Sequence, residues 1–64
     1  NLLTRREIEI LILAAEGLRN KEIAQRANIS ETTVKSHVSS IFRKLEVPNR
    51  TSMINKAKLL NILE

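Results

Sequence analysis

Apolar residues recur along the chain with the period of an amphipathic α-helix in four stretches, and short polar segments separate those stretches. The clearest stretch is SETTVKSHVSSIFRKL, residues 30–45. At about 100° per residue, its apolar side chains fall within one narrow arc: Val34, Val38, Ile41 and Leu45. The whole pattern predicts an all-α, four-helix (tetrahelical) fold, with helices at about residues 5–16, 21–27, 31–45 and 51–60.

Residues that favour helix N-termini stand before each stretch. Thr4 and Glu7 have the spacing of a capping box, in which each side chain accepts a hydrogen bond from the backbone of the other residue. Residues suited to cap the other three helices are Asn20, Ser30, and Asn49 or Thr51. The positions of these caps agree with the predicted helix starts.

The predicted helix ends carry a residue that tolerates a positive φ, followed by an apolar residue that can fold back onto the last turn. Three such pairs are Gly17 with Leu18, Asn28 with Ile29, and Asn61 with Ile62. The third helix is expected to end in a loop from Glu46 to Asn49, because Pro48 cannot continue a helix.

The connection between the second and third stretches is short, at about three residues, which favours a large crossing angle over antiparallel packing. Ala24 is small where the two helices must touch, Asn28 accepts a positive φ at the turn, and Val34 can fill the space between the helices. Together these features predict a helix-turn-helix.

The polar face of residues 30–45 differs from an ordinary solvated helix face, because it carries cations and hydroxyls and no carboxylate between Glu31 and Glu46. Small hydroxyl side chains allow a close approach, while cations and hydroxyls suit phosphates and base edges. The face consists of Thr32, Lys35, Ser36, Ser39, Ser40 and Arg43. We interpret this stretch as a DNA recognition helix.

Length and composition bound the remaining possibilities. Sixty-four residues make one domain, residues 1–64. The absence of cysteine excludes disulfides and thiolate chemistry and fits the cytoplasm, where we expect the protein to act. The longest apolar run, Ile10 to Ala15, is far shorter than the ~20 residues that cross a bilayer.

The net charge of +4 favours a polyanionic partner, and its distribution points to the third helix. Residues 35–50 hold four cations and one acid, whereas the first 29 residues hold five cations and four acids. The excess positive charge therefore lies at and just after the predicted recognition helix.

No combination of residues predicts catalysis, a cofactor or a metal site. His37 is the only histidine, and the nearest acids, Glu31 and Glu46, are six and nine residues away on other faces of the helix. The serines and threonines lack a base and an orienting acid in any plausible arrangement. We expect a protein that is not an enzyme.

Three segments give the chain a specific resemblance to a known family: LTRREIEILILAAEG, then NKEIAQRANISETTVKSHVSSIFRKLEV, then NRT. They resemble the DNA-binding domain of LuxR/FixJ/NarL-type (GerE-like) bacterial transcriptional regulators, over nearly the whole chain. The resemblance implies a third helix in the major groove, a fourth helix that mediates dimerisation on DNA, and an upstream receiver or ligand-binding domain. Because the chain does not begin with Met, we expect it to be the C-terminal effector domain of a larger regulator.

The resemblance also implies roles for single residues. Lys35, Ser36 and Ser39 match positions that face base edges. Thr33, His37 and Lys44 match positions near the phosphate backbone, and the polar face adds Thr32, Ser40 and Arg43 to that set. Dimerisation through the fourth helix is expected to involve Met53, Lys56, Ala57 and Leu60.

Two points stay open at this stage. The first helix has two competing apolar stripes, Ile10, Leu11 and Ala14 on one side and Ile8, Ile12 and Ala15 on the other, and one of them should stay partly exposed. The Ile8, Ile12 and Ala15 stripe either packs partly against the fold or serves as a docking or self-association face. The alternatives to a LuxR-type domain are a sigma-factor-like promoter-recognition domain and a helical protein-interaction module whose basic face meets an acidic protein.

Overall fold

The four predicted helices form in a computed structural model that describes residues 2–63. They are α1 (Arg5–Ala15), α2 (Asn20–Ala27), α3 (Glu31–Leu45) and α4 (Arg50–Leu59). Over the described residues there is no strand, so the predicted all-α class is confirmed. None of these helices combines the length and the apolar character that spanning a membrane requires.

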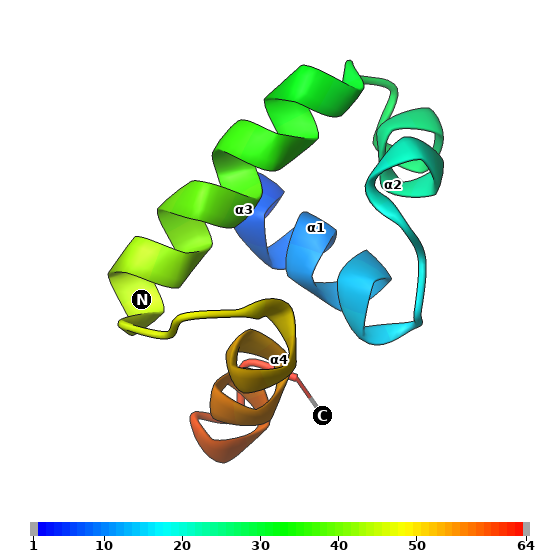
Figure 1. Cartoon of the computed structure of the whole chain (residues 1–64). Helices are drawn as coiled ribbons and strands as arrows, with labels where there is room; N and C mark the ends of the chain where they lie inside the picture. Colours follow the sequence, from blue (N-terminus) through cyan, green and yellow to red (C-terminus); the bar gives the residue numbers. More distant parts are fainter. Residues whose placement is uncertain (1, 64) are drawn as a thin grey trace.

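The longest helix, α3, packs against each of the other three. In Figure 1, α1 crosses α3 near the centre, α2 lies beside the start of α3, and α4 lies at the opposite end of the molecule from α2. One apolar cluster fills the space between them, and its largest fully buried side chains are Ile10, Leu11, Ile23, Val34, Ile41 and Met53. The predicted inward arc of residues 30–45 is therefore confirmed, because Val34, Val38, Ile41 and Leu45 are all buried.

Local side-chain caps fix the helix starts. Thr4 and Glu7 form the predicted capping box, with Glu7 N–H donating to Thr4 Oγ1 at 3.2 Å and Thr4 N–H donating to Glu7 Oε1 at 2.8 Å. The predicted caps Ser30 and Asn49 accept from the backbone N–H three residues ahead, at 3.1 and 2.8 Å.

The start of α2 differs from the prediction by one residue. Asn20 lies inside the helix and Arg19 is the cap position, because the Glu22 carboxylate reaches back to accept the Arg19 N–H at 2.8 Å. The Asn20 side chain accepts a hydrogen bond instead from Arg50 Nη2, also at 2.8 Å. This contact ties the first residue of α4 to the first residue of α2.

Every helix is followed by one residue with positive φ and then an apolar residue that packs against the core. The three predicted pairs are confirmed, and Glu46 with Val47 forms a fourth that was predicted only as part of a loop. In all four pairs the apolar residue donates its N–H to the carbonyl five residues back: Leu18 to Leu13 O at 3.4 Å, Ile29 to Ala24 O at 3.0 Å, Val47 to Phe42 O at 3.0 Å and Ile62 to Ala57 O at 2.9 Å.

The conformation of Glu46 leads to a stability prediction. Its φ of 58° is costly for a residue with a Cβ, whereas glycine adopts it freely. Glu46→Gly is therefore expected to raise the free energy of unfolding by roughly 0.5–1 kcal/mol in urea denaturation. Glu9→Gly, the same change inside α1, is the control and should lower it by about 1 kcal/mol. A decrease for both variants would contradict the prediction.

The inward face of α4 carries two of the residues that were predicted for dimerisation. Met53 and Ala57 are fully buried, whereas Leu60, predicted for the same surface, is 53% exposed. The helix ends at Leu59, so Leu60 does not continue the buried stripe. Apolar residues occur all around α4, and their spacing alone therefore did not identify the buried face.

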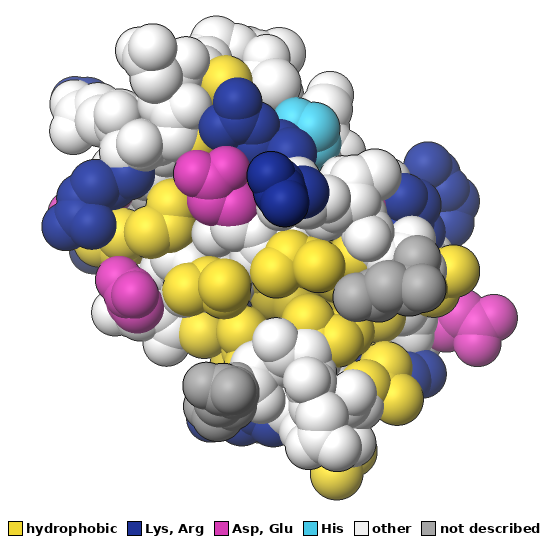
Figure 2. Space-filling model, turned by 180° about the vertical axis from the view of Figure 1, so that it is seen from behind, with side chains coloured by type: hydrophobic (Ala, Val, Ile, Leu, Met, Phe, Trp, Pro, Cys, Tyr) yellow, Lys and Arg dark blue, Asp and Glu magenta, His cyan; other side chains and the backbone are white. Residues whose placement is uncertain are grey.

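Some apolar surface remains exposed. Ile10, Leu11 and Ala14 are buried as predicted, while the second stripe of α1 is half-buried at Ile8 and 42% exposed at Ile12. Seen from behind, the molecule carries a broad band of apolar side chains (Figure 2). The large exposed apolar residues of the described chain are Leu2, Ile12, Leu59 and Leu60.

Candidate nucleic-acid interface

The outward face of α3 carries the side chains predicted to meet DNA. Thr32, Lys35, Ser36, Ser39 and Arg43 are all exposed, and they recur every three or four residues along the helix, opposite the buried arc. Within the exposed residues of this face there is no carboxylate. The face therefore offers two cations and three hydroxyls to any surface that approaches α3.

A short turn connects α2 to the start of α3. Residues 28–30 connect α2 to α3, and Asn28 takes the left-handed conformation with φ 59°. The Ser30 and Thr33 hydroxyls share a hydrogen bond of 2.8 Å beside the cap. Thr33 is thus exposed at the first turn of α3, as its predicted place near a phosphate backbone requires.

Arg6 of α1 secures this turn. Its Nη1 donates to Ala27 O, the last carbonyl of α2, at 3.0 Å and contacts Glu9 Oε1 at 3.3 Å. A cation at a helix C-terminus offsets the negative end of the helix dipole. The contact therefore holds the C-terminus of α2, from which the turn to α3 begins, against α1.

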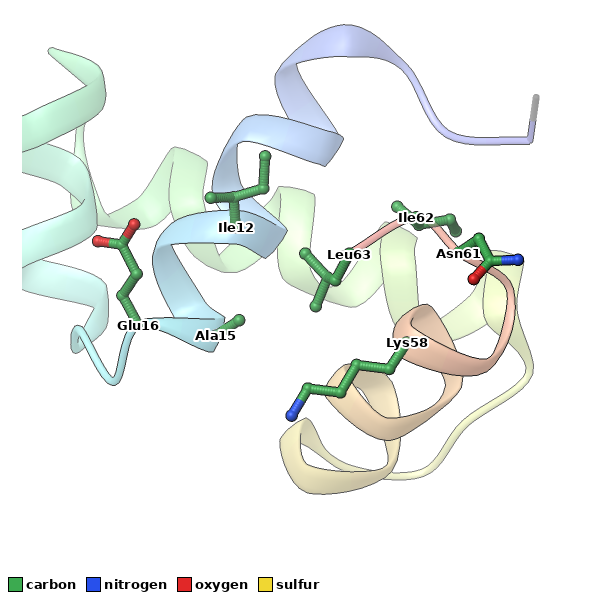
Figure 3. A pocket seen from close by; sticks show the side chains of 7 residues that line it. All are labelled: Ile12, Ala15, Glu16, Lys58, Asn61, Ile62 and Leu63. Atoms are coloured by element: carbon green, nitrogen blue, oxygen red, sulfur yellow. The ribbon is translucent and has the colours of Figure 1, made fainter.

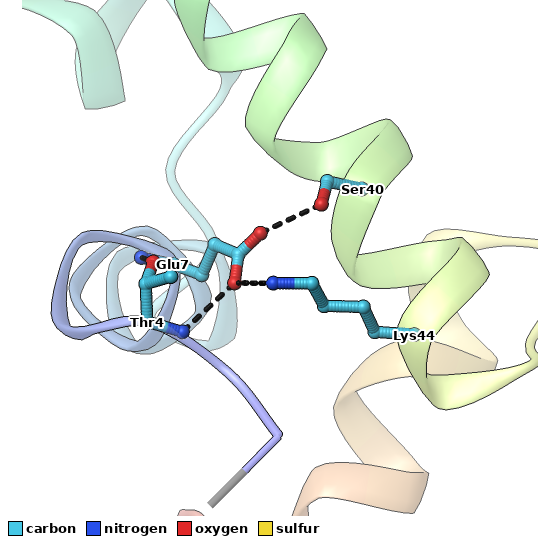
Figure 4. Close-up of polar contacts among 4 residues, drawn as sticks. All are labelled: Thr4, Glu7, Ser40 and Lys44. Atoms are coloured by element: carbon cyan, nitrogen blue, oxygen red, sulfur yellow. Dashed lines mark hydrogen bonds and ion pairs between the residues drawn. The ribbon is translucent and has the colours of Figure 1, made fainter.

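The neighbouring residue, Glu7, holds α3 itself (Figure 4). Glu7 is 3% exposed, and its carboxylate accepts hydrogen bonds from two α3 side chains, Ser40 Oγ at 2.7 Å and Lys44 Nζ at 2.8 Å. Together with the Thr4 N–H, these contacts satisfy a buried charge that would otherwise be costly. Two successive residues of α1, Arg6 and Glu7, thus hold the two helices of the helix-turn-helix.

Opposing effects act on the pKa of Glu7. Burial raises it, but the hydrogen bonds from Lys44, the Thr4 N–H and Ser40, with the charge of Lys44, outweigh burial and lower the pKa from 4.5 to about 2. Glu7 is therefore ionised across the physiological pH range and forms a charge-assisted link between α1 and α3.

This link engages two residues that were predicted to contact the DNA backbone. Ser40 and Lys44 were placed near the phosphate backbone, but both are half-buried and directed toward α1, where they bind Glu7. Sequence reasoning missed the role of Glu7. The available signal was its position: it stands three and four residues before Ile10 and Leu11, on the buried stripe of α1, where a carboxylate needs a cationic partner.

The remaining predicted site residues lie in two places. His37 is half-buried on the flank of α3. Among the described residues, no three His, Asp or Glu side chains gather as a metal site would require. Of the predicted dimerisation residues, Lys56 is half-buried and Leu60 exposed, while the burial of Met53 and Ala57 removes those two side chains from any surface.

Comparisons with known proteins give consistent results. A family model described as bacterial regulatory proteins, luxR family, matches residues 1–57. The response regulator protein VraR of Staphylococcus aureus (strain NCTC 8325 / PS 47) is 48% identical over 63 residues, and the same identity holds for VraR of Staphylococcus epidermidis. The chain is covered to 98% in this match but spans only 30% of VraR.

Two solved structures share the fold. The structure of the transcription factor GerE superimposes with a TM-score of 0.95 at 38% identity, covering 100% of this chain and 96% of GerE. The response regulator ChrA of a heme-sensing two-component system superimposes with a TM-score of 0.94 at 43% identity, covering 98% of this chain and 31% of ChrA.

Proposed function

This chain belongs to the luxR family of bacterial regulatory proteins, and on that premise we propose that it binds double-stranded DNA sequence-specifically to regulate transcription, with α3 in the major groove. Because the luxR-family model matches residues 1–57, we no longer propose a sigma-factor-like domain. Since the chain spans 30% of VraR, we further propose that it works in the cytoplasm as part of a longer regulator controlled by a receiver or ligand-binding domain.

One observation carries the proposal: the exposed, carboxylate-free face of α3. Lys35, Ser36 and Ser39 lie at the middle of this face and are the proposed base-contacting residues. The proposed backbone-contacting residues are Thr32, Thr33, His37 and Arg43. Ser40 and Lys44 are left out because Glu7 engages both.

Two copies are proposed to occupy half-sites whose centres lie about 10 bp, or a multiple of that, apart. One domain of this size makes few DNA contacts, so a second copy or an upstream domain must add affinity. If α4 contributes to pairing, it does so through Lys56 and Leu60, because Met53 and Ala57 are core residues.

Titration of duplex DNA at several salt concentrations tests the proposal. Binding to phosphates releases counterions, so log affinity should fall linearly with log salt, by about 0.9 for each phosphate contacted. Absence of measurable binding to any duplex, even at the lowest salt concentration, would reject DNA binding and favour the protein-interaction module.

Base readout by α3 is tested by comparing Lys35→Ala with Arg43→Ala. Lys35, near the start of α3, is expected to contribute about 1–3 kcal/mol of discrimination between the preferred base and the others. Lys35→Ala should therefore weaken binding to preferred sites more than binding to random DNA. Arg43, near the end of α3, is expected to contact phosphates. Arg43→Ala should therefore weaken binding to preferred sites and to random DNA by the same factor. Binding constants for a selected site and a shuffled site measure the difference, and equal losses for Lys35→Ala would remove Lys35 from base readout.

A further inference from the structure

Three side chains on the outward face of α3 are proposed to meet base edges: Lys35, Ser36 and Ser39. All three are exposed, and the hydrogen bonds of α3 side chains within the described residues are made by Thr33, Ser40 and Lys44 instead. The polar groups of the three proposed readers are therefore available to a duplex. Their chemistry differs, because a lysine ammonium only donates hydrogen bonds, whereas a serine hydroxyl both donates and accepts.

The donor-only character of Lys35 favours guanine. In the major groove guanine presents two neighbouring acceptors, O6 and N7, whereas adenine sets an amino donor beside N7 and cytosine presents an amino donor. Thymine offers a single acceptor, O4, next to a methyl group. A lysine that reaches the base edges therefore meets the most acceptors, and no opposing donor, at guanine.

The two serines do not select a base. A hydroxyl group rotates to donate to an acceptor or to accept from a donor, so it satisfies the edge of any of the four bases. Side chains that do select adenine or cytosine are the amides of Asn and Gln and the carboxylates of Asp and Glu. The exposed outward face of α3 holds none of these residue types.

Two charged residues of α3 flank this set without adding a base reader. At about 100° per residue, Glu31 falls within about 20° of the buried Val38 on the helical wheel and thus outside the outward face. Arg43 lies about 12 Å beyond Lys35 along the helix axis, whereas recognition helices contact base edges with their N-terminal residues. Lys35 is therefore the charged side chain of α3 that is placed to read a base.

A pocket elsewhere in the described chain adds no reader (Figure 3). It lies between the end of α1 and the segment that follows α4, where Ile12 and Ile62 are among the residues that line it. None of its lining residues belongs to α3. Base recognition thus remains with the outward face of α3.

We propose that each half-site is fixed by a single base pair, whose guanine faces Lys35, and that α3 accepts any base pair opposite Ser36 and Ser39. The serines add affinity through hydrogen bonds that fit every base edge. Preference at their positions then follows how easily the duplex deforms. The inference rests on the proposed function and deepens it, because it names the class of DNA sequence that α3 selects.

Selection from a random duplex pool with the wild-type chain tests this composition. The aligned half-sites should share one guanine, with no fixed base within about two positions on either side of it. Replacing that guanine should weaken binding about 5- to 150-fold, the range of one good bidentate contact. Replacing a neighbouring base pair should change the affinity by less than about threefold.

A gain of specificity at position 39 tests the role of the serines directly. Ser39 lies about 6 Å beyond Lys35 along the helix axis, which corresponds to about two base pairs of duplex. Because asparagine bonds to adenine N6 and N7, Ser39→Asn should select an adenine about two base pairs from the guanine, by at least about fivefold over the other bases. Ser39→Ala should weaken binding to all selected sites by one common factor and keep the guanine.

Thr51→Asn is the matched control for the new amide. It replaces an exposed hydroxyl residue of α4, outside the proposed DNA-contacting residues, and should leave the selected sequence unchanged. Circular dichroism checks that each variant folds. The inference is overturned by a fixed position that is not a G·C pair, by any further fixed base pair opposite the serines, or by a folded Ser39→Asn variant that selects no adenine.

Failure of the proposed function gives a different result. The wild-type chain would then bind no duplex, or bind all duplexes equally, and the pool would yield no common sequence. Enrichment of a common sequence with several fixed base pairs in each half-site removes only the single-guanine inference and leaves sequence-specific binding intact.

Discussion

Replacing Glu7 with Ala is expected to unfold a large fraction of the protein at neutral pH. The substitution removes the carboxylate of a residue that is 3% exposed and leaves its donors Ser40 and Lys44 without their acceptor. Breaking a buried ion pair on one side typically costs about 3–5 kcal/mol. At roughly 0.05–0.15 kcal/mol per residue, a domain of this length has only about 3–10 kcal/mol of stability in total.

Urea denaturation followed by circular dichroism measures this effect, with Glu9→Ala as the matched control. Glu9 also pairs with a cation of α1, Arg6, but both side chains are nearly half exposed, at 49% and 43%. Its loss should therefore cost less than about 1 kcal/mol. Equal unfolding free energies for the two variants would show that the Glu7 carboxylate does not hold α3.

The pH dependence of the unfolding free energy tests the role of Glu7 independently. Because the fold lowers the pKa of Glu7 from 4.5 to about 2, the ionised form contributes stability that is fully present above about pH 4.5 and is lost as the pH falls toward 2. The shift corresponds to about 3 kcal/mol. Glu7→Ala should lack this part of the acid dependence, so the difference in stability between wild type and variant should shrink over that range.

The helices could be predicted from the sequence because the signals that fix them are local. Thr4, Ser30 and Asn49 each bond to a backbone group three residues away, so spacing alone identifies them. The start of α2 was missed by one residue because the carboxylate of Glu22 replaced the side-chain cap that Asn20 was expected to provide.

The candidate site could be predicted only where no tertiary contact competes. Lys35, Ser36 and Ser39 remain on the exposed face because nothing in the described chain covers them. Ser40 and Lys44 belong to the same helix, but their partner Glu7 lies 33 and 37 residues away in sequence. A helical wheel of α3 contains no information on which flank α1 will cover, and such contacts therefore escaped the prediction.

Ser36→Glu is expected to weaken DNA binding at least about 100-fold while leaving the fold intact, because a like charge placed in an interface costs several kcal/mol. Ser36 is exposed at the middle of the proposed contact surface, and glutamate favours helix. Ser36→Ala removes only the hydroxyl, so its effect should correspond to one lost hydrogen bond, about 0.5–1.5 kcal/mol.

Asn55→Glu is the control for net charge. Asn55 is exposed on α4, outside the proposed DNA-contacting residues, and its replacement changes the charge of the chain by the same amount. Fluorescence anisotropy with a selected duplex should separate the two variants, since a charge farther away than about 8 Å is largely screened at physiological salt. Equal losses for both would mean that overall charge attracts the chain to DNA; a loss confined to Ser36→Glu requires that the duplex lie against the outward face of α3.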